Sequence, residues 1–289
     1  MKNTFEGEIM GVTEGDLSNL RPDALAPAAI EAKAETLSVG KANMPFGKLF
    51  VLAMFAGAFI ACGAMLFTLV QADADFSFGV KRVLGGGCFA LGLILVVNCG
   101  AELFTGNCLM VCGLGSRKID VRGLAYNWVV VWLGNLVGSL IIVALVFGSK
   151  MADMNGGAVG AAMVSIAAGK ISPDALTLIC KGILCNFLVC LAVWISFAGR
   201  TVTDKVLGVF LPVLAFVACG FEHCVANMFF LPMGWAAQAA GYAAGTIDLA
   251  GIAYNISLAT VGNIIGGAIM VGLGYWIAYR KKDDAPSKK

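Results

Sequence analysis

The sequence predicts an all-α integral membrane protein, with six transmembrane helices in two inverted three-helix repeats whose second and fifth helices are broken. Three observations predict this fold. Apolar residues make up 59% of the 289 residues and charged residues only 13%, about half the charged share of ordinary soluble domains. Six apolar segments are long enough to cross a bilayer. Two of these segments share a motif that places an ionisable residue near the middle.

Each apolar segment reaches the roughly 20 residues that a spanning helix needs. The second is interrupted by Glu102, and the fifth by Glu222 and by His223, the single histidine of the chain. We therefore expect an N-terminal segment (1–45), a transmembrane domain (46–280) and a C-terminal tail (281–289). The expected spans are Leu49–Val70, Val83–Ser116, Gly123–Ser149, Ala175–Gly199, Val206–Gln238 and Leu249–Tyr279.

The distribution of lysine and arginine predicts the orientation. Six spans place both termini on one side of the membrane, and most basic residues lie on that side. The opposite side carries Lys81, Arg82, Lys150 and Lys170. The positive-inside rule therefore predicts cytoplasmic termini. Residues Asn19–Lys41 are expected to form an amphipathic cytoplasmic helix, which either lies on the membrane or covers the mouth of a pore.

The composition also argues against several classes of function. The 20 Lys and Arg nearly balance the 18 Asp and Glu, which leaves no basic patch for nucleic acid. Ten cysteines lie in apolar stretches without CxxC pairs, so we expect packing residues rather than disulfides or a metal site. No cofactor is expected. An enzyme built on His223 and the two glutamates is disfavoured because polar residues are so few.

Two motifs recur in the same order along the chain. The second segment contains Cys99-Gly100-Ala101-Glu102, and the fifth contains Cys219-Gly220-Phe221-Glu222, 120 residues later. In each, an asparagine (Asn107 or Asn227) follows five residues after the glutamate. A second motif with two asparagines links the third and sixth segments (Asn127 and Asn135, Asn255 and Asn263). The first and fourth segments show no match. A repeat of three spans starts its second copy on the opposite side, which makes the repeats inverted.

The repeated motifs predict helix breaks at Gly100 and Gly220, near the membrane midplane. A break in the bilayer core is tolerated only where it faces protein or a water-filled cavity. The half-helix that follows each break directs its N-terminal N–H groups and a partial positive charge toward the centre. Two opposed half-helices would favour a small anion.

Each ionisable residue near the breaks has two possible roles. We expect Glu102 and Glu222 to accept hydrogen bonds from N–H groups freed at the breaks, with a place on the pathway as the alternative. His223 is expected to contact a permeating species by hydrogen bond or proton transfer, with core packing as the alternative. Lys170 either draws anions into a vestibule or extends to lipid headgroups, as Lys181 does more readily.

At these residues the sequence resembles the formate/nitrite transporter family. One family motif is matched by residues 100–106 and another by residues 182–192, and the similarity extends from about Pro45 to Tyr279. The resemblance implies an aquaporin-like homopentamer in the cytoplasmic membrane of a prokaryote, with a pore in each protomer. It implies a channel for small monovalent weak-acid anions, with protons and the lipid bilayer as further partners. Formate is the first expectation, and nitrite or hydrosulfide the alternatives, because the motif at Glu102 looks more like nitrite channels.

The resemblance also assigns residues to roles. It places hydrophobic constrictions at Phe89, Leu93, Leu103 and Phe216, and structural breaks at Gly100, Glu102 and Gly220. The implied substrate pathway contains His223, Thr105, Asn186, Glu222, Asn227 and Lys170. Simple packing of the two phenylalanines and interhelical hydrogen bonding by Asn186 are the alternatives. A channel for water or neutral solutes is a function of another class, although the Asn-Pro-Ala motif of aquaporins is absent.

Overall fold

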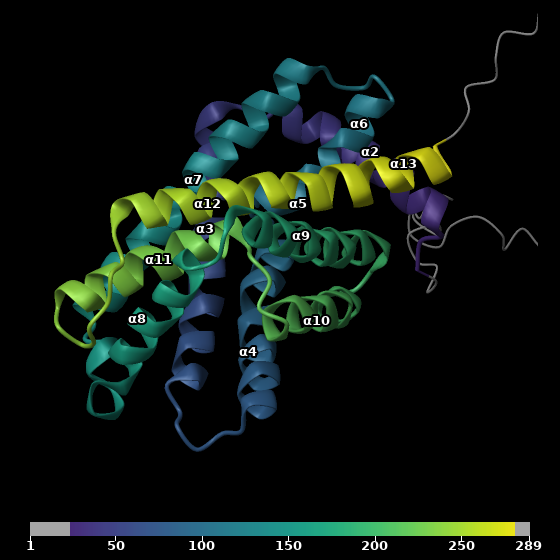
Figure 1. Cartoon of the computed structure of the whole chain (residues 1–289). Helices are drawn as coiled ribbons and strands as arrows, with labels where there is room; N and C mark the ends of the chain where they lie inside the picture. The colour runs from purple at the N-terminus through teal and green to yellow at the C-terminus, as the bar shows by residue number, and fades with distance from the viewer. Residues whose placement is uncertain (1–23, 281–289) are drawn as a thin grey trace, which may run out of the picture.

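The computed structural model describes residues 24–280, and every regular element in this range is a helix (Figure 1). The start of the expected helix at Asn19 and the tail 281–289 lie outside the described residues. The first half contains α2 (Pro27–Ala42), α3 (Phe46–Gln71), α4 (Phe78–Cys99), α5 (Phe104–Asn107), η1 (Cys108–Met110), α6 (Val111–Gly115) and α7 (Val121–Gly148). The second contains η2 (Met151–Asp153), η3 (Asn155–Gly157), α8 (Ala158–Ile171), α9 (Ala175–Ala198), α10 (Val202–Ala218), α11 (Cys224–Ala239), α12 (Leu249–Ile264), the π-helical η4 (Ile265–Leu273) and α13 (Gly274–Tyr279).

Within this range, five helices are long and apolar enough to cross a membrane: α3, α4, α7, α9 and the continuous run Leu249–Tyr279. The fifth predicted segment is divided into α10, with 17 residues, and α11, with 16. The second segment ends as α4 at Cys99 and resumes as α5 at Phe104. The breaks therefore lie at the two repeated motifs, as predicted from the sequence.

Short polar side chains determine where several helices begin. Asp120 accepts a hydrogen bond from Gly123 N at the start of α7 (2.7 Å), and Asp174 accepts one from Thr177 N at the start of α9 (3.0 Å). Thr201 and Asp204 form a capping box on α10, and Asp248 caps α12. Such caps satisfy N–H groups that have no partner within the helix.

Small residues allow the long helices to pack closely. α3 packs against α4 and α7, and α9 packs against α10 and α12. A Cβ atom at Gly138 would overlap the carbonyl oxygen of Met54, and one at Gly266 would overlap that of Ile183. Glycine at these positions brings the backbones together, as is common between membrane helices. The same close approach therefore occurs once in each repeat.

The sequence analysis missed α8, a helix that extends the repeat. It packs against α11 and α12, and Lys170 lies in its last turn. In the first repeat, α2 ends with Lys41 in the equivalent place. Each lysine forms an ion pair with the glutamate of its own repeat, Lys41 with Glu102 and Lys170 with Glu222. The repeat thus has four elements, and α2 and α8 lie at opposite ends of the molecule in Figure 1.

Glu35 docks α2 onto the rest of the chain, and a second glutamate lies one turn before it. Glu35 pairs with Lys118 (2.5 Å) and accepts a hydrogen bond from the hydroxyl of Ser116. Trp276 of α13 in turn donates its indole N–H to that hydroxyl oxygen (2.7 Å). Glu31 is buried beside Glu35, and its Oε1 has no hydrogen-bond partner among the described residues.

The first prediction concerns the docking of α2. Burial, together with the hydrogen bond and charge of Glu35, raises the pKa of Glu31 from 4.5 to about 7. Because the folded-state pKa is raised, the stability that Glu31 contributes is complete below 4.5 and decreases as pH rises through about 7. Hydrogen exchange of α2 amides, corrected for intrinsic rates, should increase over that range. Glu31→Gln should abolish the increase, and an unchanged pH dependence in this variant would contradict the assignment.

Candidate functional site

Each break begins with a glycine in a left-handed conformation. Gly100 has φ of 76° and Gly220 has φ of 74°, a region that glycine adopts without strain. Both residues follow the last turn of a helix, α4 or α10, and direct the chain into a short extended link. The links end at Leu103 and His223, which occupy the N-cap positions of α5 and α11.

One asparagine in each repeat satisfies the backbone groups freed by the break. Asn135 of α7 accepts a hydrogen bond from Phe104 N (2.9 Å) and donates to the carbonyl oxygens of Ala53 (2.8 Å) and Glu102 (2.9 Å). Asn263 of α12 makes the same three bonds in the second repeat, with Cys224 N (2.9 Å), Gly182 O (2.8 Å) and Glu222 O (2.8 Å). The match of Ala53 with Gly182 extends the repeat to α3 and α9, where the sequence shows none.

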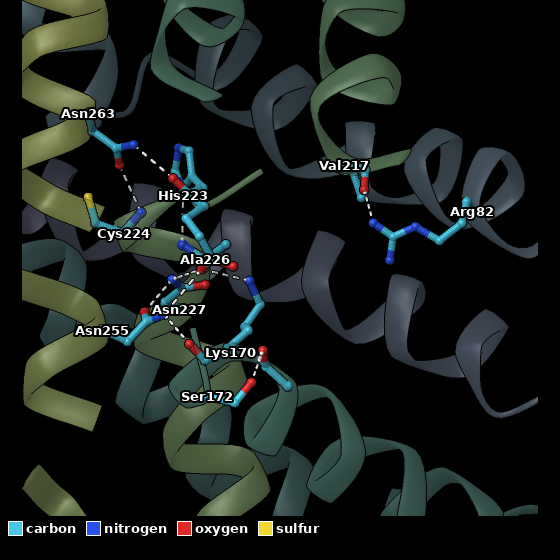
Figure 2. A network of polar contacts seen from close by, with 12 residues as sticks. Arg82, Lys170, Ser172, Val217, His223, Cys224, Ala226, Asn227, Asn255 and Asn263 are labelled. Atoms are coloured by element: carbon cyan, nitrogen blue, oxygen red, sulfur yellow. Dashed lines mark hydrogen bonds and ion pairs between the residues drawn. The ribbon is translucent and has the colours of Figure 1, made fainter. Parts of the chain in front are cut away.

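The two glutamates are bound by side chains rather than by the freed N–H groups that we expected. Glu222 Oε2 accepts hydrogen bonds from Lys170 Nζ (3.1 Å), Asn227 Nδ2 (2.6 Å) and Asn255 Nδ2 (3.3 Å), and Figure 2 shows these three donors converging. Glu102 accepts from Lys41 Nζ (2.6 Å) and Asn107 Nδ2 (2.7 Å). Each buried carboxylate therefore has a cationic partner, which offsets the cost of removing it from water.

His223 uses both ring nitrogens. Its Nδ1 accepts a hydrogen bond from Ala226 N (3.0 Å), and its Nε2 lies 2.9 Å from the hydroxyl oxygen of Thr105. Since Nδ1 is an acceptor, the neutral ring carries its proton on Nε2 and donates it to Thr105. The ring also stacks on Phe216, with centroids 5.9 Å apart. The histidine thus links the start of α11 to the start of α5.

Asn186 reaches the site from α9 and has no hydrogen bond with His223 among the described residues. Its Nδ2 donates to the carbonyl oxygens of Thr105 (3.2 Å) and Asn263 (2.7 Å). The thiol of Cys190 also donates to Thr105 O (3.3 Å). Asn186 therefore positions the backbone that carries the threonine hydroxyl.

Two separate cavities approach this polar centre, and each is lined by residues of both repeats. The first, here named the α8 cavity, has a volume of about 330 Å³ and contains His223, Glu222, Lys170, Phe89 and Phe216 in its wall. The second, the α2 cavity, has a volume of about 590 Å³ and is lined by Lys41, Glu102, Leu93 and Leu103 among others. No described residue lines both cavities. The layer between them therefore contains His223 on one side and Leu103, its counterpart in the repeat, on the other.

The expected constriction residues divide between the cavities. Phe89 and Phe216 meet edge to face in the α8 cavity, with ring centroids 5.8 Å apart. Leu93 and Leu103 line the α2 cavity. All four side chains are almost fully buried. Thr105, Asn186 and Asn227 line neither cavity and lie behind the walls, although Thr105 reaches His223.

Several residues of the site were not assigned in the sequence analysis. Lys41, Asn135 and Asn263 carry central contacts, and the two asparagines stand in the repeated motif that could have shown their role. Arg82 lines the α8 cavity and donates to the carbonyl oxygen of Val217 (2.7 Å) at the end of α10, as Figure 2 shows. It also donates to the carbonyl oxygen of Ala218 (2.8 Å). No sequence signal indicates that contact, because it joins two segments far apart in the chain.

Apolar helices that surround a buried polar centre between two opposed cavities define a membrane channel or transporter for a small solute. The family model described as formate/nitrite transporter matches residues 28–277. The chain belongs to the formate/nitrite transporter family.

Several relatives and solved structures are similar over most of the chain. The formate channel FocA of Escherichia coli K12 is 40% identical, covering 91% of this chain and 97% of that protein. The uncharacterized transporter YrhG of Bacillus subtilis is 43% identical, covering 91% and 95%. A pentameric formate channel solved with formate bound has a TM-score of 0.72 at 38% identity, covering 82% and 98%. A second structure, described as an FNT family ion channel, has a TM-score of 0.77 at 31% identity, covering 86% and 98%.

These relatives are channels or transporters and not enzymes, and the chain is a membrane channel of the formate/nitrite type. The resemblance found in the sequence is thereby confirmed, together with the all-helical fold with broken helices.

The second prediction tests the two asparagine clamps. Asn263→Ala removes the partner of Cys224 N and of Glu222 O at the break, and each buried unpaired group costs about 1–3 kcal/mol. Asn135→Ala should destabilise the protein by a similar amount, because it makes the equivalent three bonds. Thermal unfolding in detergent measures both effects.

Asn98→Ala is the matched control, because Asn98 Nδ2 bonds only to Ile94 O of its own helix. It should leave the unfolding midpoint nearly unchanged. If Asn98→Ala is as destabilising as the other two variants, the clamps have no special role.

Proposed function

We propose that this protein is a homopentameric channel for small monovalent weak-acid anions, with formate as its substrate. The observation that carries the proposal is the His223–Thr105 pair, buried between two cavities whose inner walls are apolar. The similarity to a pentameric formate channel with formate bound supports both the substrate and the assembly. Both cavities and the pair lie within one chain, which favours a separate pathway in each protomer.

The charges around both cavities favour anions. The α8 cavity is lined by Arg82, Lys170 and Lys181 against the single carboxylate of Glu222. The α2 cavity is lined by Lys33, Lys41, Lys48 and Lys205 against Glu102. Clefts with an excess of one charge raise the local concentration of the opposite ion. Lys170 contributes to the positive charge of the α8 cavity and also forms the ion pair with Glu222.

The apolar layer distinguishes charged from neutral solutes by the free-energy cost of removing their water. An ion that passes Phe89, Phe216, Leu93 and Leu103 must lose most of its water, which costs far more for a charge than for a neutral molecule. A weak acid can cross such a layer in its protonated, neutral form. Proton-assisted passage therefore suits formate, nitrite and hydrosulfide, and it excludes hydrated ions that cannot be neutralised.

His223 assists this protonation in the proposed mechanism. The Thr105 oxygen accepts a hydrogen bond from the Nε2–H group of His223, so the hydroxyl hydrogen of Thr105 can be donated to an anion that enters the layer between the cavities. A second proton on the ring must occupy Nδ1, at the expense of the bond from Ala226 N. Proton transfer through His223 is thus coupled to the cap of α11.

The basic residues support an orientation with the α2 cavity facing the cytoplasm. In this orientation both termini are cytoplasmic in the inner membrane of a prokaryote, with segment 1–45 and tail 281–289 flanking the transmembrane domain. The α8 cavity then faces the other side. Lys33, Lys41, Lys48 and Lys205 support it, because they lie together around the α2 cavity.

The third prediction tests the histidine. Asparagine is a good N-cap, so His223→Asn should retain the start of α11 while removing the titratable ring. Formate uptake into proteoliposomes should then lose its dependence on pH. Thr105→Val should reduce uptake, because it removes the hydroxyl while preserving the shape of the side chain. An unchanged pH profile in His223→Asn would refute protonation through this residue.

The fourth prediction concerns the substrate itself. Uptake of formate, nitrite and hydrosulfide, compared in the same proteoliposomes, should be fastest for formate. A preference for nitrite or hydrosulfide would assign the alternative substrate within the family. Osmotic swelling that does not depend on the anion would instead indicate a channel for water or neutral solutes.

A further inference from the structure

Four phenylalanines form a connected aromatic wall in the α8 cavity. Phe67 of α3 meets Phe230 of α11 edge to face, with ring centroids 5.6 Å apart. Phe230 stacks on Phe89 (6.3 Å), which in turn meets Phe216 edge to face (5.8 Å). All four rings line the cavity and are at most 6% exposed. Phe67 and Phe230 therefore extend the wall beyond the two residues expected from the sequence.

A cation lies over each of the two additional rings. The guanidinium carbon of Arg82 is 5.8 Å from the centroid of Phe67, and Lys170 Nζ is 5.4 Å from that of Phe230. Both cations are held in place, Arg82 by carbonyl oxygens at the end of α10 and Lys170 by Glu222. A ring face carries negative potential and repels anions, and a cation over that face offsets the repulsion. The additional rings can therefore line a path for an anion.

The α2 cavity has no such wall among its described lining residues. The repeat relation that pairs Ala53 with Gly182 places Ser196 at the position of Phe67. The relation that pairs Glu102 with Glu222 places Val96 at the position of Phe216. Ser196 and Val96 both line the α2 cavity, which is larger than the α8 cavity (about 590 against 330 Å³). The aromatic wall thus lines only the smaller of these two cavities, and both repeats contribute rings to it.

We propose that Phe67 and Phe230 form an outer phenylalanine pair in the α8 cavity, and that Phe230 sets the upper size limit for anions that pass through this cavity. This inference rests on the proposed function as an anion channel. Phe230 is the key residue because it alone touches both Phe67 and Phe89 and also lies under Lys170. The outer phenylalanine pair admits one-carbon and equally small anions and disfavours larger monocarboxylates.

The physical basis is the close packing of the wall. Each of the four rings is held by at least one other ring, so the wall has little room to move aside for a larger solute. One additional methylene group in a tight apolar site typically changes discrimination by about 10–200-fold. Acetate differs from formate by one methyl group, and it is therefore a suitable probe of the limit.

The experiment compares uptake of radiolabelled acetate and formate in proteoliposomes that contain the full-length protein. Phe230→Ala should raise the ratio of acetate to formate uptake by about tenfold or more. Phe197→Ala is the matched control, because Phe197 lines the α2 cavity. The control should leave the ratio unchanged. Phe230→Met, a milder change, should raise the ratio by less and keeps the test available if the alanine variant does not assemble.

The possible failures can be told apart. If wild-type protein transports formate but neither Phe230 variant raises the ratio, the size limit lies elsewhere and the inference is wrong. If Phe197→Ala raises the ratio of acetate to formate uptake equally, the effect is not specific to the outer phenylalanine pair. That result would also overturn the inference. If wild-type protein transports no formate, nitrite replaces formate as the reference. If no small anion passes at all, the proposed function fails and the inference fails with it.

Discussion

The structure depends on one constraint, which is that backbone N–H and C=O groups inside a membrane need partners. Each broken helix frees such groups at the centre of the protein, and one asparagine from a neighbouring helix satisfies two of them, while its third hydrogen bond goes to a carbonyl oxygen of α3 or α9. This solution requires α7 and α12 to lie in exact register against α3 and α9. The glycines at positions 138 and 266 permit that close approach. The caps at Leu103 and His223, and hence the cavities on either side, are placed by these contacts.

A second set of contacts ties the flanking helices to the breaks. Lys41 at the end of α2 and Lys170 at the end of α8 each neutralise the glutamate of a break. Because a buried carboxylate without its partner is costly, undocking either flanking helix would strain the break beneath it. The same two lysines border the cavities. The same two lysines are therefore placed both to attract an anion and to stabilise the site.

The main features of the fold could be predicted from the sequence, because apolar length and the repeated Cys-Gly-x-Glu motif are local signals. Both breaks followed from them, and so did the position of His223 at the second break. The partners of Glu102 and Glu222 did not, since Lys41 and Lys170 reach them only through tertiary docking. The helix α8 was missed because it is too short for a span and lies between two longer ones. The aromatic contact of Phe67 with Phe230 joins α3 to α11. These helices are far apart in the sequence, so no local pattern predicts the contact.

The two repeats share a scaffold but differ at its centre, where one carries His223 and the other Leu103. A solute that arrives from the α8 cavity meets an imidazole, whereas one that arrives from the α2 cavity meets an aliphatic side chain. Such unlike entrances can give different saturation and different sensitivity to blockers on the two faces. They cannot rectify transport at equilibrium, because microscopic reversibility requires equal forward and backward flux when the gradients vanish. Net direction must therefore come from the electrochemical gradients across the membrane, and not from the shape of the protein.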